Sequence, residues 1–209
     1  MDAEVRYQKR SFDLCEPNFS LRLNRRNRIM ARLSWVQRLY WRSFSKPVSE
    51  RALCVHAIEN PLASILEIGM GNGDRIKRLL PLCTKADGTP QIRYVGVDAF
   101  ESAAPGVPHM QLKAAHRMLA EFGVKAHLIP GDPTNALARV AHTVLPSDLI
   151  VIDGAWGEDS PQGHAIAEWL PRLCHSKSTI FATAKQGGIL GRVDLPIAAV
   201  EQSTVKRAA

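Results

Sequence analysis

The sequence predicts an α/β protein with a doubly wound, mostly parallel sheet and a basic helical extension at its N-terminus. From residue 62 onward, short apolar runs alternate with segments whose apolar residues recur at helical spacing. The 209 residues, 45% hydrophobic and 22% charged, fall in the range of one globular domain. The basic excess is confined to residues 1–51, which hold 12 of the 27 Lys/Arg and 5 of the 20 Asp/Glu, so the remainder is neutral.

We expect residues 1–60 to form the extension and residues 61–209 the domain. Seven arginines and no acidic residue lie from Arg22 to Arg42, and apolar residues recur there at helical spacing, which predicts an amphipathic basic helix. Residues 48–59 predict a second helix. Three roles remain open for the basic helix: a lid over the domain, an arm that binds RNA phosphates, or a helix on an anionic membrane surface.

The first strand and helix of the domain flank a glycine-rich turn. Residues 63–69 form a short apolar run that ends at Gly69, as expected of a buried parallel strand. Residues 74–83 predict a helix, because their apolar side chains recur at helical spacing at Ile76, Leu79, Leu80 and Cys83.

The rest of the domain repeats the alternation of strand and helix. Apolar runs predict strands at residues 92–97, 125–129, 148–153 and 178–184. Between them, helical periodicity predicts helices at residues 111–122, 135–144 and 164–174. We expect one last strand within residues 191–200. Strands joined through helices make right-handed crossovers, so the sheet is expected to be parallel and covered on both faces.

Residues 67–74 read E-I-G-M-G-N-G-D, directly after a strand and opening a helix. Glycines let the backbone approach a ligand closely, and the helix that follows offers unpaired N–H groups. A dinucleotide-binding G-x-G-x-x-G motif beginning at Gly69 requires glycine or alanine at position 74, where this chain has Asp74. The pattern is instead E-x-G-x-G-x-G, which disfavours a nicotinamide enzyme.

With this pattern the chain resembles the class I S-adenosylmethionine-dependent methyltransferase family over about residues 62–185. The residues that match the family's first motif are Glu67, Gly69, Gly71 and Gly73. The resemblance implies a Rossmann-like methyltransferase fold, S-adenosyl-L-methionine as cofactor and a methyl-transferring enzyme. It also implies that these four residues bind the cofactor.

Acidic residues follow successive strands, and the resemblance assigns a role to each. Asp98 stands where the family binds both ribose hydroxyls, as a carboxylate can. Asp132 stands where such proteins contact the adenine amino group, although capping of the next helix explains it nearly as well. Asp153 lies at the edge of the methyl-transfer site. Trp156 is expected either to stack on adenine or on a flat acceptor, or to pack in the core.

The acceptor is the open question. Residues 148–154 are similar to small-molecule O-methyltransferases, which favours O-methylation of a small molecule. No Asp-Asn pair follows the fifth strand, so we expect no catalytic metal. Asp153 and Lys185 also match the middle of the Lys-Asp-Lys-Glu set of RNA ribose 2′-O-methyltransferases, which makes both catalytic candidates and RNA an alternative partner. A non-catalytic cofactor-binding or interaction module is a further alternative.

Cysteine spacing and hydropathy exclude several classes of protein. The four cysteines are scattered without a C-x-x-C pair, against both a disulfide framework and a zinc site. The charged first residues do not resemble a secretory signal, and no apolar run approaches the length of a membrane helix. We therefore expect a cytoplasmic protein without a transmembrane segment. The oligomeric state stays open.

Overall fold

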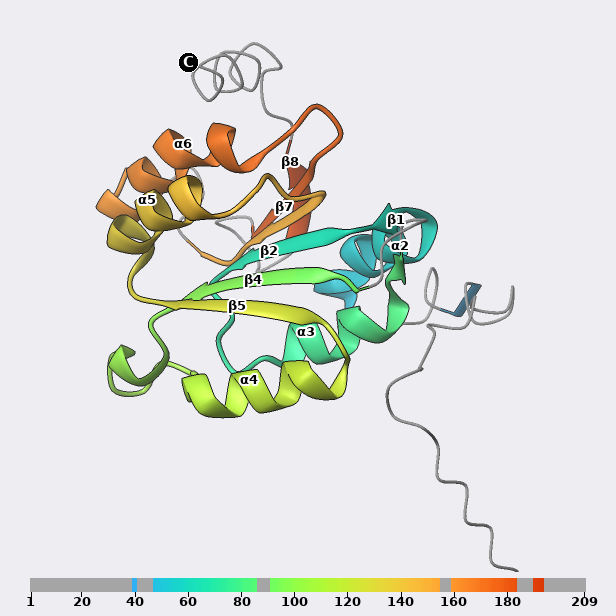
Figure 1. Ribbon diagram of the computed structural model, residues 1–209, viewed down its shortest axis with the longest axis horizontal. Coiled ribbons are helices and arrows are strands. Elements are labelled where there is room, and N and C mark those ends of the chain that lie inside the picture. The colour runs from blue at the N-terminus through green and yellow to red at the C-terminus, as the bar shows by residue number, and fades with distance from the viewer. Residues whose placement is uncertain (1–38, 41–46, 86–90, 155–158, 184–189, 194–209) are drawn as a thin grey trace, which may run out of the picture.

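The computed structural model describes residues 39–40, 47–85, 91–154, 159–183 and 190–193. A six-stranded sheet with the order β5-β4-β2-β6-β7-β8 runs through the described part (Figure 1). Its strands are β2 (Ser64–Ile68), β4 (Arg93–Asp98), β5 (Lys125–Pro130), β6 (Leu149–Ile152), β7 (Thr179–Thr183) and β8 (Leu190–Val193). All neighbours are parallel except β7 and β8, which are antiparallel. The predicted doubly wound, mostly parallel sheet is confirmed.

Helices cover both faces of this sheet, α5 and α6 on one face and α3 and α4 on the other (Figure 1). The α-helices are α2 (Arg51–Glu59), α3 (Asp74–Leu79), α4 (Leu112–Glu121), α5 (Pro133–Thr143) and α6 (Pro161–Leu173). The described residues also form three single turns of 3-10 helix, η2 (Val48–Glu50), η3 (Leu80–Leu82) and η4 (Phe100–Ser102). A separate short pair joins β1 (Pro61–Leu62) to β3 (Thr84–Lys85).

The position of each strand in the sheet explains its burial. The central strands β2 and β6 are buried along their whole length, because helices pack on both of their faces. The edge strand β5 instead alternates between exposed and partly buried residues until Ile129. An apolar core therefore lies on each face of the sheet. One core includes Ile65 and Tyr94, and the other includes Leu66 and Ile150.

Helix ends differ from the predicted ranges where local chemistry sets them. The predicted helix at residues 74–83 ends as an α-helix at Leu79 and continues as η3, because Pro81 has no N–H to donate. Helix α6 begins at Pro161, three residues before the predicted start. The Ser160 side chain caps it by accepting a hydrogen bond from the Gly163 N–H.

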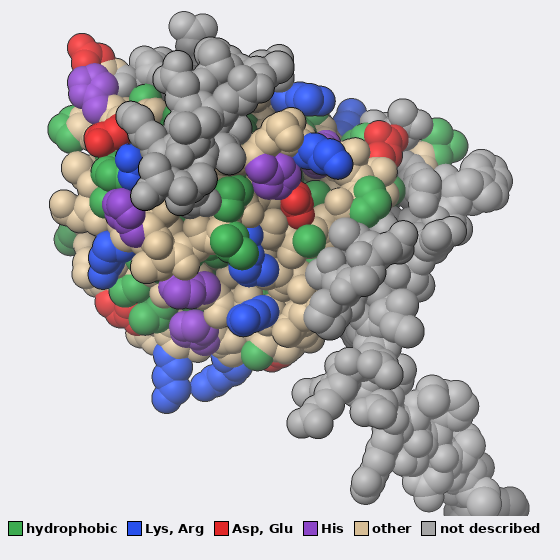
Figure 2. All heavy atoms as spheres, turned by 45° about the horizontal axis from the view of Figure 1, so that its top comes forward, with side chains coloured by type: hydrophobic (Ala, Val, Ile, Leu, Met, Phe, Trp, Pro, Cys, Tyr) green, Lys and Arg blue, Asp and Glu red, His purple; other side chains and the backbone are tan. Residues whose placement is uncertain are grey.

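The second predicted helix of the extension is present as η2 and α2. Its Leu53 and Ala57 are fully buried in the core, so this part of residues 1–60 packs against the sheet. The basic helix predicted between Arg22 and Arg42 lies outside the described residues apart from Leu39 and Tyr40. Lys, Arg and His side chains of the described part are spread over the face in Figure 2 with Asp and Glu among them, in agreement with its neutral composition.

Asp148 ties the amino ends of three strands together. Its Oδ2 accepts hydrogen bonds from the N–H groups of Ala63 and Ser64, at 2.7 and 2.9 Å, and Oδ1 lies 2.9 Å from Nε2 of His175. Burial raises the pKa of Asp148, but these hydrogen bonds outweigh it, so the pKa lies below its usual value. Asp148 is therefore a structural residue at the edge of the sheet opposite the glycine turn.

We predict that Asp148→Ala destabilises the protein by about 2 kcal/mol, because two backbone N–H groups lose their acceptor. The loss should shrink as the pH falls below about 4, since the wild-type carboxylate itself loses its advantage when it is protonated. Urea unfolding at pH 7 and pH 3 measures both effects. An equal loss at both pH values would contradict the assigned role.

Within the described residues, no helix is long and apolar enough to span a membrane.

Candidate functional site

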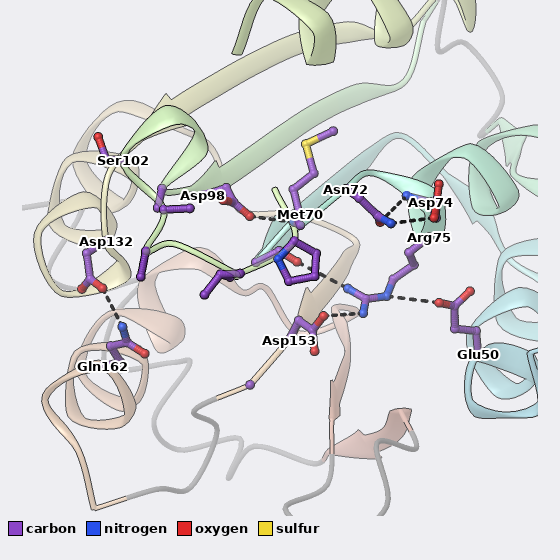
Figure 3. Close-up of a pocket in the computed structure, with 18 of the residues that line it drawn as sticks. Glu50, Met70, Asn72, Asp74, Arg75, Asp98, Ser102, Asp132, Asp153 and Gln162 are labelled. Carbon is purple, nitrogen blue, oxygen red and sulfur yellow. Dashed lines mark hydrogen bonds and ion pairs between the residues drawn. The ribbon is translucent and has the colours of Figure 1, made fainter. Parts of the chain in front are cut away.

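A cavity of about 910 Å³ opens at the carboxyl ends of the parallel strands (Figure 3). This edge is where doubly wound sheets bind ligands, and the volume is in the range of small-molecule sites. The polar and charged residues that line it include Glu50, Asn72, Asp74, Arg75, Arg78, Asp98, Ser102, Asp132, Asp153 and Gln162. Most come from the segments that follow β2, β4, β5 and β6, and Glu50 comes from η2.

The glycine turn fits tightly against its neighbours. Gly69 has φ +83°, and a Cβ placed there would lie 3.1 Å from the Cβ and the carbonyl oxygen of Asp153. Gly73 has φ +76° and precedes α3, and a Cβ there would come within 2.8 Å of the Met110 side chain. Side chains larger than hydrogen are therefore strained at both positions. The turn brings the backbone next to Asp153.

Most backbone N–H groups along this turn already donate to protein oxygens. Gly71 N–H donates to Oδ2 of Asp98 at 2.7 Å, and Asp74 N–H donates to the Asn72 side chain at 3.2 Å. Gly69 and Gly73 donate to the carbonyl oxygens of Val97 and Met70. A loop that cradles phosphate needs such N–H groups to be free. This one is therefore not arranged for phosphate.

Asp98 is where the turn meets the end of β4. Its Oδ2 accepts from Gly71, and its Oδ1 accepts from the N–H of Phe100 at 3.1 Å. The backbone of Phe100 has φ +48°, a conformation that residues other than glycine rarely adopt, and the Phe100 ring is buried. Each carboxylate oxygen has two lone-pair directions, so Asp98 still has one free on each oxygen. It can accept two further hydroxyl donors.

Asp132 combines a cap with a place on the cavity wall. Its Oδ1 accepts from Thr134 N–H at 2.9 Å and caps α5, and its Oδ2 accepts from the Gln162 amide (Figure 3). Burial raises the pKa of Asp132, but these hydrogen bonds outweigh it and the pKa is lowered. The capping role that the sequence offered for Asp132 is present, and both Asp132 and Gln162 also line the cavity.

Glu67 lies beneath the glycine turn and is almost completely buried. It accepts hydrogen bonds from the Tyr94 hydroxyl at 2.6 Å and from Nη1 of Arg75 at 3.1 Å. Burial raises the pKa of Glu67, and Arg75 and Tyr94 only partly oppose this effect. Glu67 therefore anchors Arg75, whose Nη1 also lies 3.5 Å from the carbonyl oxygen of Gly69 in the turn.

Arg75 joins three carboxylates and was not singled out by the sequence. Its Nη2 lies 2.6 Å from Oδ2 of Asp153, its Nη1 lies 3.1 Å from Oε1 of Glu67, and its Nε lies 3.7 Å from Oε1 of Glu50. The Arg75 side chain is only 14% exposed. Its place two residues after Gly73, the last glycine of the motif, is the only sequence signal that could have found it. Glu50 and Gln162 carry no such signal.

Asp153 follows β6, and its side chain is 43% exposed to the cavity. Besides the ion pair with Arg75, its Oδ1 accepts from the Thr183 hydroxyl at 2.9 Å. The other two residues predicted near it, Trp156 and Lys185, lie outside the described part of the chain.

The cavity has an acidic lining. Five carboxylates and two guanidinium groups line it among the described residues: Glu50, Asp74, Asp98, Asp132 and Asp153, and Arg75 and Arg78. Such a lining favours a cationic ligand over an anionic one. No group of three His, Cys, Asp or Glu side chains in the described ranges is arranged to hold a metal ion.

The strand order places the chain in the doubly wound α/β class, with a cavity at the edge where such sheets bind ligands. No family model and no curated protein matches the chain. Among solved structures, the O-methyltransferase TomG from Streptomyces achromogenes, in complex with SAM, is similar at 17% identity and a TM-score of 0.47, over 80% of this chain and 70% of that one. Cofactor-bound Rv0187 from MTB is similar at 21% identity and a TM-score of 0.46, over 83% of this chain and 76% of that one.

The small RNA methyltransferase HEN1 is similar at 20% identity and a TM-score of 0.46. The match covers 68% of this chain but spans only 17% of HEN1. Identities and scores this low are not evidence of a shared function, and the assignment of the site therefore depends on its own residues.

Proposed function

We propose that this protein binds S-adenosyl-L-methionine and transfers its methyl group to an oxygen of a small molecule. The observation that carries the proposal is the glycine turn, most of whose N–H groups are already bonded within the protein, next to the free lone pairs of Asp98. A ligand held here is bound through hydroxyl groups and positive charge rather than through phosphates. A sulfonium nucleoside has both features.

The same observations argue against a nicotinamide dinucleotide. Its pyrophosphate would need N–H groups that Gly71 and Asp74 have already committed to Asp98 and Asn72. Its negative charge would also meet the acidic lining of the cavity. The substitution of Asp74 for the small residue of the dinucleotide motif is in agreement with this argument.

The residues present fit the two ends of a nucleoside. Asp98 has two lone-pair directions free for the two ribose hydroxyls. Asp132 and Gln162 lie together on the wall beyond it, where an amide and a carboxylate can contact the adenine amino group. Asp153 and Arg75 lie at the other side of the turn. The cavity volume accommodates a ligand of this size.

For methyl transfer, the task of the protein is to hold donor and acceptor in line. When bound, S-adenosylmethionine supplies an electrophilic methyl group on a positively charged sulfur. Gly69 and Gly73 shape the turn, and Asp98 fixes the nucleoside. Asp153 has lone pairs left after its bonds with Arg75 and Thr183, so it can accept the acceptor's hydroxyl hydrogen. Lys185 and Trp156 remain predicted contributors.

The test is transfer of a labelled methyl group to two acceptor pools, one of phenols, catechols and hydroxy acids and one of total RNA. We expect label in the small-molecule pool. At saturating cofactor, Asp153→Asn should lower turnover by about 100-fold, because it removes the carboxylate that accepts the acceptor's hydroxyl hydrogen. Label in RNA alone would support the ribose methyltransferase alternative, and cofactor binding with no label in either pool would support the non-catalytic alternative.

A further inference from the structure

The end of the cavity opposite Asp132 holds a chain of alternating charges. Figure 3 shows Asp153, Arg75 and Glu50 in sequence along this end, with Asp132 and Gln162 at the other. Arg75 contacts both acidic neighbours, Asp153 at 2.6 Å and Glu50 at 3.7 Å. Alternating charges of this kind complement a ligand that carries an ammonium and a carboxylate on the same carbon.

Glu50 reaches this end from η2, which precedes the sheet in the chain. Although it is a carboxylate, it is buried, with 7% of its surface exposed. Both of its oxygens bind Arg78, with Nε at 2.9 Å and Nη2 at 2.8 Å, and Oε1 also faces Nε of Arg75. A buried carboxylate held by two arginines has a fixed position.

The Nε atom of Arg75 is buried and has no hydrogen-bond partner in the described structure. Glu50 compensates this donor by charge, at 3.7 Å, rather than by a hydrogen bond. Without Glu50, only Asp153 and Glu67 attract the guanidinium, and both lie on its other side. Glu50 therefore opposes the attraction of Asp153 and Glu67 for the Arg75 guanidinium and fixes how close its Nη2 atom lies to Asp153.

We propose that Glu50 is a positioning residue for the amino-acid end of the cofactor, acting through Arg75. The inference rests on the proposed function, since it assumes a ligand that joins a nucleoside to an amino acid. In this arrangement, Arg75 pairs with the ligand's carboxylate and Asp153 pairs with its ammonium group. The segment before α2 thereby contributes to a site that is otherwise built from the strand ends of the sheet.

Two probes separate this role from general stability. S-Adenosylhomocysteine carries both the nucleoside and the amino acid, whereas 5′-methylthioadenosine carries only the nucleoside. Glu50→Gln should weaken S-adenosylhomocysteine about tenfold, as expected for a misplaced charged partner, and change 5′-methylthioadenosine less than about twofold. Glu168→Gln, an exposed glutamate of α6, is the matched control and should change neither affinity.

Calorimetric titration of the full chain gives the six affinities, those of both probes for the wild type, Glu50→Gln and Glu168→Gln. If Glu50→Gln weakens both probes equally, or weakens neither, the inference is overturned. If Glu50→Gln fails to fold, Glu50→Asp is the second variant, because it keeps the charge for Arg78. It should raise the ratio of the Kd for S-adenosylhomocysteine to the Kd for 5′-methylthioadenosine about two- to threefold. An unchanged ratio in Glu50→Asp overturns the inference. Failure of the wild-type protein to bind either probe would instead overturn the proposed function.

Discussion

Replacing Arg75 with methionine is expected to destabilise the folded protein by about 3–5 kcal/mol, as for the removal of one partner from a buried ion pair. The substitution leaves Glu67 buried and without its cation, and Glu50 and Asp153 lose a shared partner. Methionine preserves most of the volume of the side chain, so the loss reports charge rather than packing. Urea unfolding at neutral pH measures it.

The effect of Arg75→Met should also depend on pH. The pKa of Glu67 is already raised by burial, and loss of Arg75 raises it further. A raised folded-state pKa means that the contribution of Glu67 is fully present below its unfolded pKa of about 4.3 and is lost as the pH rises through the folded value. The penalty of the substitution should therefore be smaller at pH 5 than at pH 8.

The matched control for Arg75→Met is Lys77→Met, two residues further along α3. Lys77 pairs with Asp74 at 3.2 Å on the exposed surface, where such a pair contributes about 0–1 kcal/mol. A loss for Arg75→Met no larger than for Lys77→Met, at either pH, would show that the guanidinium does not hold the three carboxylates together.

Replacing Asp98 with alanine should have the largest effect on cofactor binding. Asp98 holds the turn through Gly71 N–H and, in the proposed function, accepts both ribose hydroxyls. We expect a loss of about 1.5–3 kcal/mol, or roughly 10- to 150-fold in Kd for S-adenosylmethionine. Calorimetric titration measures the affinity, and thermal unfolding establishes that the variant is folded.

Two further variants make this prediction specific. Asp98→Asn keeps one acceptor for Gly71 and should bind with intermediate affinity. Asp159→Asn removes a carboxylate whose side chain is 98% exposed and whose contact is with His164 on the surface, so its affinity should equal that of the wild type. Wild-type affinity in Asp98→Ala would remove this residue from the site.

The alternation of strands and helices could be predicted because the central strands are short, mostly apolar runs. Strands β2 and β6 are buried on both faces, and each is followed directly by a residue that the sequence marks, Gly69 and Asp153. Parallel strands bring their carboxyl ends to one edge, and Asp98 and Asp132, which follow two such strands, both line the cavity there.

The contacts that link these residues could not be predicted in the same way. Arg75 meets Asp153 across 78 residues of chain and Arg78 meets Glu50 across 28, and no periodicity encodes such pairs. Glu67, which the resemblance places at the cofactor, is buried and accepts a hydrogen bond from Tyr94 of the neighbouring strand β4, a contact that the sequence does not encode. The role of a buried carboxylate depends on which strand lies beside it.

The most direct test of the central claim is calorimetric titration of the purified protein with S-adenosylmethionine, S-adenosylhomocysteine and NAD. We predict micromolar binding of the first two and no binding of NAD, because the N–H groups of the glycine turn are already bonded and the cavity is acidic. Binding of NAD, or no binding of either sulfur nucleoside at millimolar concentration, would contradict the proposed function.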